Sequence, residues 1–243
     1  MAVRRRWPAS WLAYGSDTWT GRRRGRRRPA APGGEREPVP VMPWSARRSR
    51  WRARPGTLFV LVGGLWLFGT GEAVLVDAGL GNSPWTVLAQ GISRHSRLSI
   101  GGATLLVSLA VLLAWVPLRE RPGLGTLANA VIVALAIDVM LPLLPAPTGI
   151  APRLVAVFVA VACIGLASGL YLTANLGAGP RDGWMTGLCR RTGWPVGWVR
   201  FGIEATVLVV GAALGGTVGV GTLLFAVLVG HAVGAVLGGL RRV

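Results

Sequence analysis

The stretch GLGNSPWTV, residues 79–87, decides how this sequence folds because it interrupts a long apolar run. Two glycines and an asparagine end that run, and a shorter apolar segment restarts at Pro84. Ser83 suits the N-cap of a helix, and Pro84 suits the first helical position, where its missing N–H costs no hydrogen bond. The stretch therefore predicts a long helix, a break around Gly81 and a short helix that begins at Pro84.

The composition places the chain in a membrane. Of its 243 residues, 52% are hydrophobic and only 14% are charged, whereas about a quarter of the residues in a soluble domain are charged. Six apolar segments can each cross a hydrocarbon layer of about 30 Å at a rise of about 1.5 Å per residue. We expect an all-α integral membrane protein with six transmembrane helices, at about Leu58–Leu80, Gly101–Leu118, Leu124–Leu144, Arg153–Leu176, Gly197–Leu214 and Val220–Leu240.

The broken stretch occurs twice. Its second copy, NLGAGPRDG at residues 175–183, follows the first by 96 residues, the distance from Gly81 to Gly177. The same offset carries GLGTL (residues 123–127) onto GVGTL (residues 219–223) without a gap. We interpret this register as a duplication of one membrane unit.

Each unit, at about residues 56–150 and 151–243, contains three predicted spans. Since three is odd, the second unit must be inserted upside down, which gives the inverted repeat of many secondary transporters. Each unit also carries a short half-helix after its Gly/Pro break. The break motifs comprise Gly81, Ser83, Pro84, Gly177, Gly179, Pro180 and Asp182.

The short helices have two alternative placements. A helix of about ten residues is about 15 Å long, half the thickness of a membrane. If the two helices re-enter from opposite faces, their N-terminal amides and dipoles offer partly positive ends to an anionic group near the membrane centre. Alternatively, both lie flat at the interface, with Trp85 and Trp184 as belt residues.

The N-terminal tail carries most of the charge. The formal net charge is +17, and 15 of the 26 basic residues, all of them Arg, lie in residues 1–55. Because this Arg/Pro-rich segment cannot form a core, we expect it to be disordered and cytoplasmic, near anionic lipid, and nucleic-acid binding is the weaker interpretation. Met42 is an alternative start, in which case the residues before it come from an over-extended gene. The membrane domain comprises residues 56–243.

Loop arginines predict the orientation. With the tail inside, the cytoplasmic loops and adjoining span end carry eight Arg, whereas the external segments carry Arg94, Arg97 and Arg153. By the positive-inside rule, both termini are cytoplasmic.

Four segments carry a resemblance to known proteins and occur in this order between residues 79 and 200: GLGNSPWTVL, PLRERPGLGTLANAVIVALAID, GLYLTANLGAGPRDGWMTGL and RRTGWPVGWVR. They resemble the YitT/YczE-like family of bacterial integral membrane proteins, over roughly Gly56 to Leu240. The resemblance implies a multi-pass protein of the bacterial inner membrane and no assigned biochemical activity. Relatives usually have Asp where this chain has Thr86, and Gly-Pro where it has Gly230-His231. If paired acids form a symmetric site, only Asp182 of the pair is left here.

Ionisable residues inside the spans are the candidates for a substrate or proton site, because a charge costs at least about 2.5 kcal/mol at the bilayer centre. Glu72 and Asp138 lie at one depth in two outward-running spans, so they share a proton or a cation if the spans are neighbours, or bond separately to polar groups. Glu204 lies four residues from Arg200 and is expected to pair with it. His231 is a candidate proton relay or a hydrogen-bonded packing residue.

Other patterns are weaker. Glycines spaced four apart in residues 165–169, 211–215 and 230–238 predict close helix packing or a homodimer seam. Cys163 and Cys189 lack metal-ligand spacing and are expected to remain thiols. Without a Ser/His/Asp set, a metal cluster or a phosphate loop, we expect no enzyme activity, metal or cofactor.

Two functions fit these features. The first is a small permease or exporter, of unknown substrate, built from two inverted units. The second is a non-transporting accessory or regulatory protein that docks partners through its glycine faces and basic loops. The repeat, the interrupted segments and the intramembrane acids favour the first.

Overall fold

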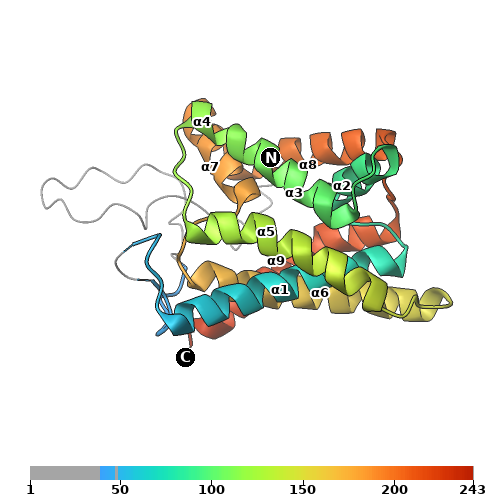
Figure 1. Ribbon diagram of the computed structural model, residues 1–243, viewed down its shortest axis with the longest axis horizontal. Helices are drawn as coiled ribbons and strands as arrows, with labels where there is room; N and C mark the ends of the chain where they lie inside the picture. The colour runs from blue at the N-terminus through green and yellow to red at the C-terminus, as the bar shows by residue number, and fades with distance from the viewer. Residues whose placement is uncertain (1–38, 47–48, 243) are drawn as a thin grey trace, which may run out of the picture.

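A computed structural model of the chain describes residues 39–46 and 49–242 (Figure 1). The predicted disorder of residues 1–38 lies outside this part. Every regular element in the described residues is helical, and six helical segments are long and apolar enough to cross a membrane. These are α1 (Pro55–Ala78), α3 (Ile100–Leu113) continued by α4 (Trp115–Leu118), α5 (Leu124–Met140) continued by a 3-10 turn (Leu141–Leu143), α6 (Ile150–Thr173), α8 (Val196–Ala213) and α9 (Val220–Leu240). The six predicted spans are confirmed as helices, with ends that differ by a few residues.

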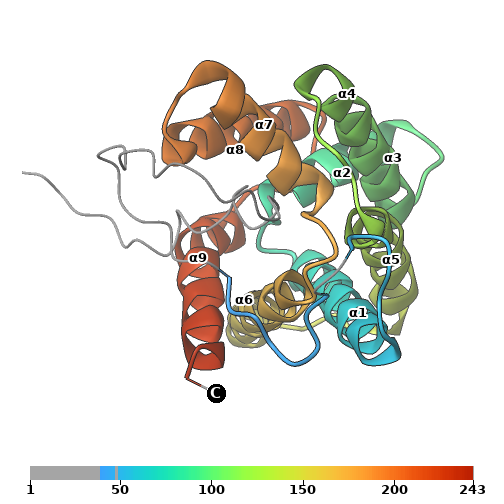
Figure 2. The same ribbon diagram turned by 90° about the vertical axis from the view of Figure 1, so that its left-hand side faces the viewer.

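The long helices run side by side in two layers (Figures 1 and 2). One layer has the order α5, α1, α6, α9, and α3 and α8 belong to the other. The closest packing surrounds α1, where glycines bring backbones together. A Cβ at Gly69 would lie 2.5 Å from the Cβ of Ala136, and one at Gly71 would lie 2.7 Å from Ile164 Cγ1.

Several of the spaced glycines pack helices within the chain. A Cβ at Gly165 would lie 2.6 Å from the Cβ of Ala232 on α9, and one at Gly211 would lie 2.5 Å from the Leu88 amide nitrogen. These two glycines therefore bring α6 against α9 and α8 against the segment after Pro84. The homodimer seam stays a prediction.

Two short helices, α2 (Pro84–His95) and α7 (Pro180–Thr192), begin at the two predicted prolines. The break before each contains a glycine in the left-handed region, Gly81 at φ 111° and Gly177 at φ 121°. A side chain is excluded at both, since a Cβ would lie 2.5 Å from the Gly219 nitrogen in the first case and 2.7 Å from Thr126 Oγ1 in the second.

The two breaks are held by matching hydrogen bonds across the molecule. The Gly221 amide at the start of α9 donates to the Leu80 carbonyl (2.8 Å), and the Gly125 amide at the start of α5 donates to the Leu176 carbonyl (2.9 Å). Donors and acceptors are each 96 residues apart in the sequence. Each break therefore rests on the third span of the other half of the chain.

Residues before α1 pack against the end of α6. The Ser45 hydroxyl donates to the Thr173 carbonyl (2.5 Å), the Ala46 amide donates to the Ala174 carbonyl (3.0 Å), and the Asn175 side chain donates to the Ala46 carbonyl (3.0 Å). Met42 is buried. Part of the segment expected to be disordered is thus seated on the bundle, because its backbone completes hydrogen bonds at this helix end.

The two halves differ at one seam. Gly101 brings α3 against α5, where Asp138 accepts hydrogen bonds from Ser99 Oγ (2.6 Å) and the Gly101 amide (2.8 Å). At the corresponding position on α8, a side chain added to Gly197 would meet nothing within 4 Å. The α8 ribbon accordingly stands away from α9 (Figure 2).

Candidate functional site

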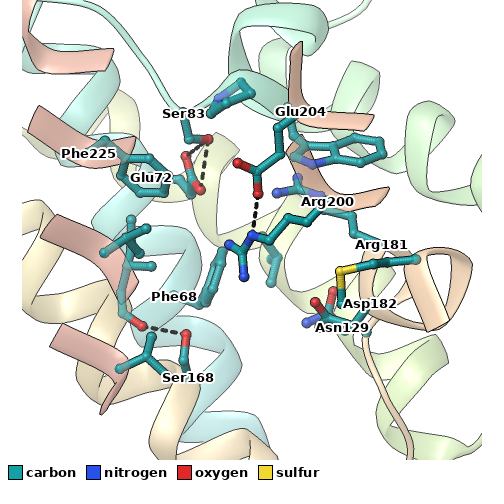
Figure 3. Close-up of a pocket in the computed structure, with 18 of the residues that line it drawn as sticks. Phe68, Glu72, Ser83, Asn129, Ser168, Arg181, Asp182, Arg200, Glu204 and Phe225 are labelled. Carbon is teal, nitrogen blue, oxygen red and sulfur yellow. Dashed lines mark hydrogen bonds and ion pairs between the residues drawn. The ribbon is translucent and has the colours of Figure 1, made fainter. Parts of the chain in front are cut away.

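A cavity of about 160 Å³ lies between the layers. The first residues of α2 and α7 line it, together with residues from all six long helices. Five charged side chains face it: Glu72, Arg181, Asp182, Arg200 and Glu204 (Figure 3). Charged groups at this depth in a span are costly and are retained where they are paired or functional.

Glu72 is the buried acid of the cavity, with 1% of its surface exposed. Its carboxylate accepts hydrogen bonds from two hydroxyls, Ser83 Oγ (2.9 Å) and Thr86 Oγ1 (2.8 Å). Both donors belong to the first turn of α2 and its N-cap. The α1 acid therefore sits at the positive end of the α2 dipole.

The beginning of α2 differs from the prediction in one respect. Ser83 does occupy the N-cap position, but its hydroxyl makes no hydrogen bond to an amide of the first turn. The hydroxyl donates to the Glu72 carboxylate, a charge-assisted hydrogen bond. The first amides of α2 are left without a side-chain cap at the edge of the cavity.

The α7 end brings a positive and a negative side chain to the same cavity. Asp182 accepts a hydrogen bond from the Tyr171 hydroxyl (2.9 Å). Arg181 extends from α7 to α2, and its guanidinium carbon lies 5.0 Å from the centroid of the Trp85 ring. This cation–π contact joins the first turns of the two short helices.

Arg200 and Glu204 form the predicted ion pair, with 2.7 Å between Arg200 Nε and Glu204 Oε1. About a third of each side chain is exposed (34% and 33%), so the pair lies in an open part of the cavity lining rather than in a packed core. Its geometry is that of neighbours one helical turn apart.

The structure brings together only part of the predicted site. Glu72, Glu204 and Asp182 line one cavity, as do Ser83, Pro84 and Gly179 of the break motifs. Gly81, Gly177 and Pro180 shape the breaks behind it. Asp138 is bonded instead to Ser99 and Gly101 at the start of α3, and His231 Nδ1 lies 2.9 Å from the Val227 carbonyl on α9; neither lines the cavity.

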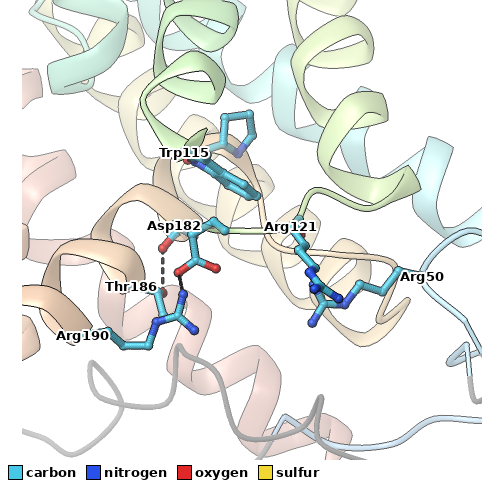
Figure 4. A network of polar contacts seen from close by, with 8 residues as sticks. Arg50, Trp115, Arg121, Asp182, Thr186 and Arg190 are labelled. Carbon is cyan, nitrogen blue, oxygen red and sulfur yellow. Dashed lines mark hydrogen bonds and ion pairs between the residues drawn. The ribbon is translucent and has the colours of Figure 1, made fainter. Parts of the chain in front are cut away.

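The far side of α7 is fixed by a polar network (Figure 4). The Trp115 indole donates to the Pro180 carbonyl (2.9 Å), and the Thr186 hydroxyl donates to the Asp182 carbonyl (2.8 Å). Arg190 pairs with Glu120 in the loop before α5. The Trp115 bond holds the first turn of α7, next to Arg181, and the Arg190–Glu120 pair holds its last turn.

The sequence pattern of the family of unknown function DUF6198 matches residues 56–237. The chain belongs to this family. An "Uncharacterized protein" of Haemophilus influenzae is 41% identical over 195 residues, covering 80% of this chain and 89% of the relative. The "Uncharacterized membrane protein YczE" of Bacillus subtilis is 34% identical over 183 residues, covering 74% and 82%. The YczE-like resemblance is thereby confirmed, whereas no solved structure matches the chain.

Sequence reasoning missed the cavity roles of Arg181, Arg200 and Trp85. Arg181 and Trp85 had a signal, because they occupy the same position in the two copies of the broken stretch, 96 residues apart. Equivalent residues that contact each other lie where two related halves meet. Nothing in the local sequence around Arg200 distinguishes a cavity residue from a helix-end ion pair.

Proposed function

We propose that this chain is a small permease or exporter-type transporter of the inner membrane, and that the cavity is its substrate site. The observation that carries the proposal is the meeting of both short-helix N-termini and five charged side chains around one central cavity. Binding sites at the interface of two inverted units are the usual arrangement in secondary transporters.

In this proposal, residues 56–150 and 151–243 form an inverted repeat. Its support is reciprocity: the two break hydrogen bonds match, α1 packs on α5 as α6 packs on α9, and α2 lies on α8 as α7 lies on α3. A duplicated unit with an odd number of spans gives this arrangement.

The short helices α2 and α7 then act as half-helices inside the membrane. With 12 and 13 residues, they are about 18–20 Å long at 1.5 Å per residue, too short for a layer of about 30 Å. They occupy opposite ends of the bundle in Figure 1, while both N-termini line the cavity. This placement is favoured over helices lying flat at the interface.

Alternating access follows from the unequal seams. The α3–α5 seam is closed by Gly101 and Asp138, whereas its counterpart at Gly197 is open. In a protein of two related halves, exchanging the open and closed seams gives the second state. The excess of Arg in the loops on the same side as the termini supports an orientation with both termini in the cytoplasm.

Reconstituted protein tests the function. A panel of radiolabelled small anions, cations, zwitterions and neutral solutes is offered to proteoliposomes, and both uptake and efflux are measured. We expect flux of one class, lost in Glu72→Gln and Arg181→Gln. Asp77→Asn, which removes another acid of α1 outside the cavity, serves as the control and retains flux. Absence of flux for every solute in correctly inserted protein contradicts transport and leaves the accessory role.

A further inference from the structure

The charges around the cavity balance one another. Three carboxylates (Glu72, Asp182 and Glu204) face two guanidiniums (Arg181 and Arg200). The N-termini of α2 and α7 each add about half a positive charge. A ligand of net charge therefore needs a partner of opposite charge to enter with it, because an unbalanced charge at this depth is costly.

Arg181 is the cavity cation whose N–H donors are available to a ligand. Within residues 39–46 and 49–242, it has no carboxylate at ion-pair distance and no hydrogen bond, only the face of Trp85. Arg200, by comparison, is paired with Glu204. A guanidinium offers five N–H donors in a planar fork that matches a carboxylate.

Glu72 is a negative group close to the place where a bound anion would meet Arg181. Glu72 and Arg181 both line the cavity. The Glu72 carboxylate lies at the first turn of α2 through Ser83 and Thr86, and the Arg181 guanidinium lies at the same turn through Trp85. While Glu72 is ionised, its negative charge offsets the positive groups that an incoming anion needs.

The remaining wall combines apolar and uncharged polar side chains, and the space is small. Its apolar part includes Phe68, Val133, Ile164, Phe225 and Val229, and its polar part includes Thr104, Ser108, Asn129 and Ser168. An enclosed cavity of about 150 Å³ accommodates benzene, so about 160 Å³ suits a carboxylate with a short alkyl chain.

We propose that the cavity binds a small monocarboxylate together with one proton, with the proton on Glu72 and the carboxylate on Arg181 and the first amides of α2. This inference rests on the proposed function and names its substrate class and coupling ion. Proton uptake converts the Glu72 carboxylate to a neutral acid, and the substrate anion replaces the lost negative charge. Charge balance is kept with one proton for each anion.

Other groups around Glu72 do not provide a second free cation. The titratable and charged groups that face it in the cavity are Tyr171 on α6, Arg181 and Asp182 on α7, and Arg200 and Glu204 on α8. The cavity residues of α2, α3, α5 and α9 are uncharged. Glu72 is bonded to the first turn of α2, and Arg181 lies at the same turn, so this acid is the one in position to control the site.

Calorimetry on the full chain in lipid nanodiscs tests this, with empty nanodiscs as blanks. Butyrate is the probe, and butyramide, butylammonium and chloride are the comparison ligands. Titrations in two buffers of different ionisation enthalpy report the protons taken up. We expect butyrate binding with one proton per anion, and affinity that falls about tenfold per pH unit where Glu72 is ionised. Glu72→Gln keeps the affinity but loses proton uptake and pH dependence, and Arg181→Gln lowers affinity at least about tenfold.

Several results overturn the proposal. They are butylammonium binding in place of butyrate, butyrate binding by wild type without proton uptake, equal affinity for chloride, or unchanged affinity in folded Arg181→Gln. The proton count uses wild type alone, so it stands even if a variant does not fold. Flux of another solute without butyrate binding contradicts this inference but not transport, whereas butyrate binding without flux contradicts transport but not the site.

Discussion

The guanidinium of Arg181 lies over the ring of Trp85, 5.0 Å from its centroid, and the two residues hold the same position in the two broken stretches. The contact brings the first turns of α7 and α2 together at the cavity. It also makes the two halves unequal at their meeting point, where one supplies a charge and the other an aromatic face.

Removing a donor from Glu72 is expected to change the pH dependence of the site. Thr86→Val deletes the hydroxyl that lies 2.8 Å from the carboxylate. A carboxylate with fewer donors holds its proton more tightly, so butyrate binding persists to higher pH than in wild type. Calorimetry across a pH series measures the shift. Thr104→Val removes another hydroxyl of the cavity lining, and a similar shift in that variant contradicts a specific role for Thr86.

The two break glycines are expected to be intolerant of a side chain. Gly81→Ala and Gly177→Ala force a Cβ into left-handed backbone and against the facing helix start. We expect each to lower the stability by about 2 kcal/mol or more. Gly63→Ala is the matched control, since a side chain there meets nothing within 4 Å. Thermal unfolding in detergent compares the three, and equal midpoints would contradict the packing of the breaks.

The segment before α1 is expected to stabilise the bundle. A chain that starts at Met42 keeps the contacts of Ser45 and Ala46 with the end of α6, whereas one that starts at Gly56 loses them. The first should unfold at the same temperature as the full chain, and the second at a lower one, because buried carbonyls are left without donors. A full chain markedly more stable than the Met42 form would show that residues 1–41 also matter.

Much of the fold follows from local sequence. Apolar length marks the six spans, and proline marks the starts of α2 and α7, since both signals depend on neighbouring residues alone. The Arg200–Glu204 pair was predictable for the same reason, because its spacing is one helical turn.

The site was less predictable because it depends on which helices meet. Glu72 and Asp138 were predicted to share a depth. Asp138 accepts hydrogen bonds from the start of α3, whereas Glu72 accepts them from the start of α2. Ser83 was expected to cap its own helix, but its hydroxyl accepts no hydrogen bond from the first turn and donates to a carboxylate of another helix. Such competition between partners is decided in three dimensions and leaves no local pattern.

Exchange of the two seams is the most direct test of an alternating transporter. Spin labels at Leu113 and Val131 report the α3–α5 seam, and labels at Val209 and Val227, each 96 residues further on, report the α8–α9 seam; all four sites are exposed. Double electron–electron resonance in liposomes, with and without butyrate at acidic and alkaline pH, measures both distances. For an alternating transporter we predict two distance populations for each label pair, with the distance across one seam lengthening as the distance across the other shortens. A single, unchanging distance for each pair under all conditions would contradict it.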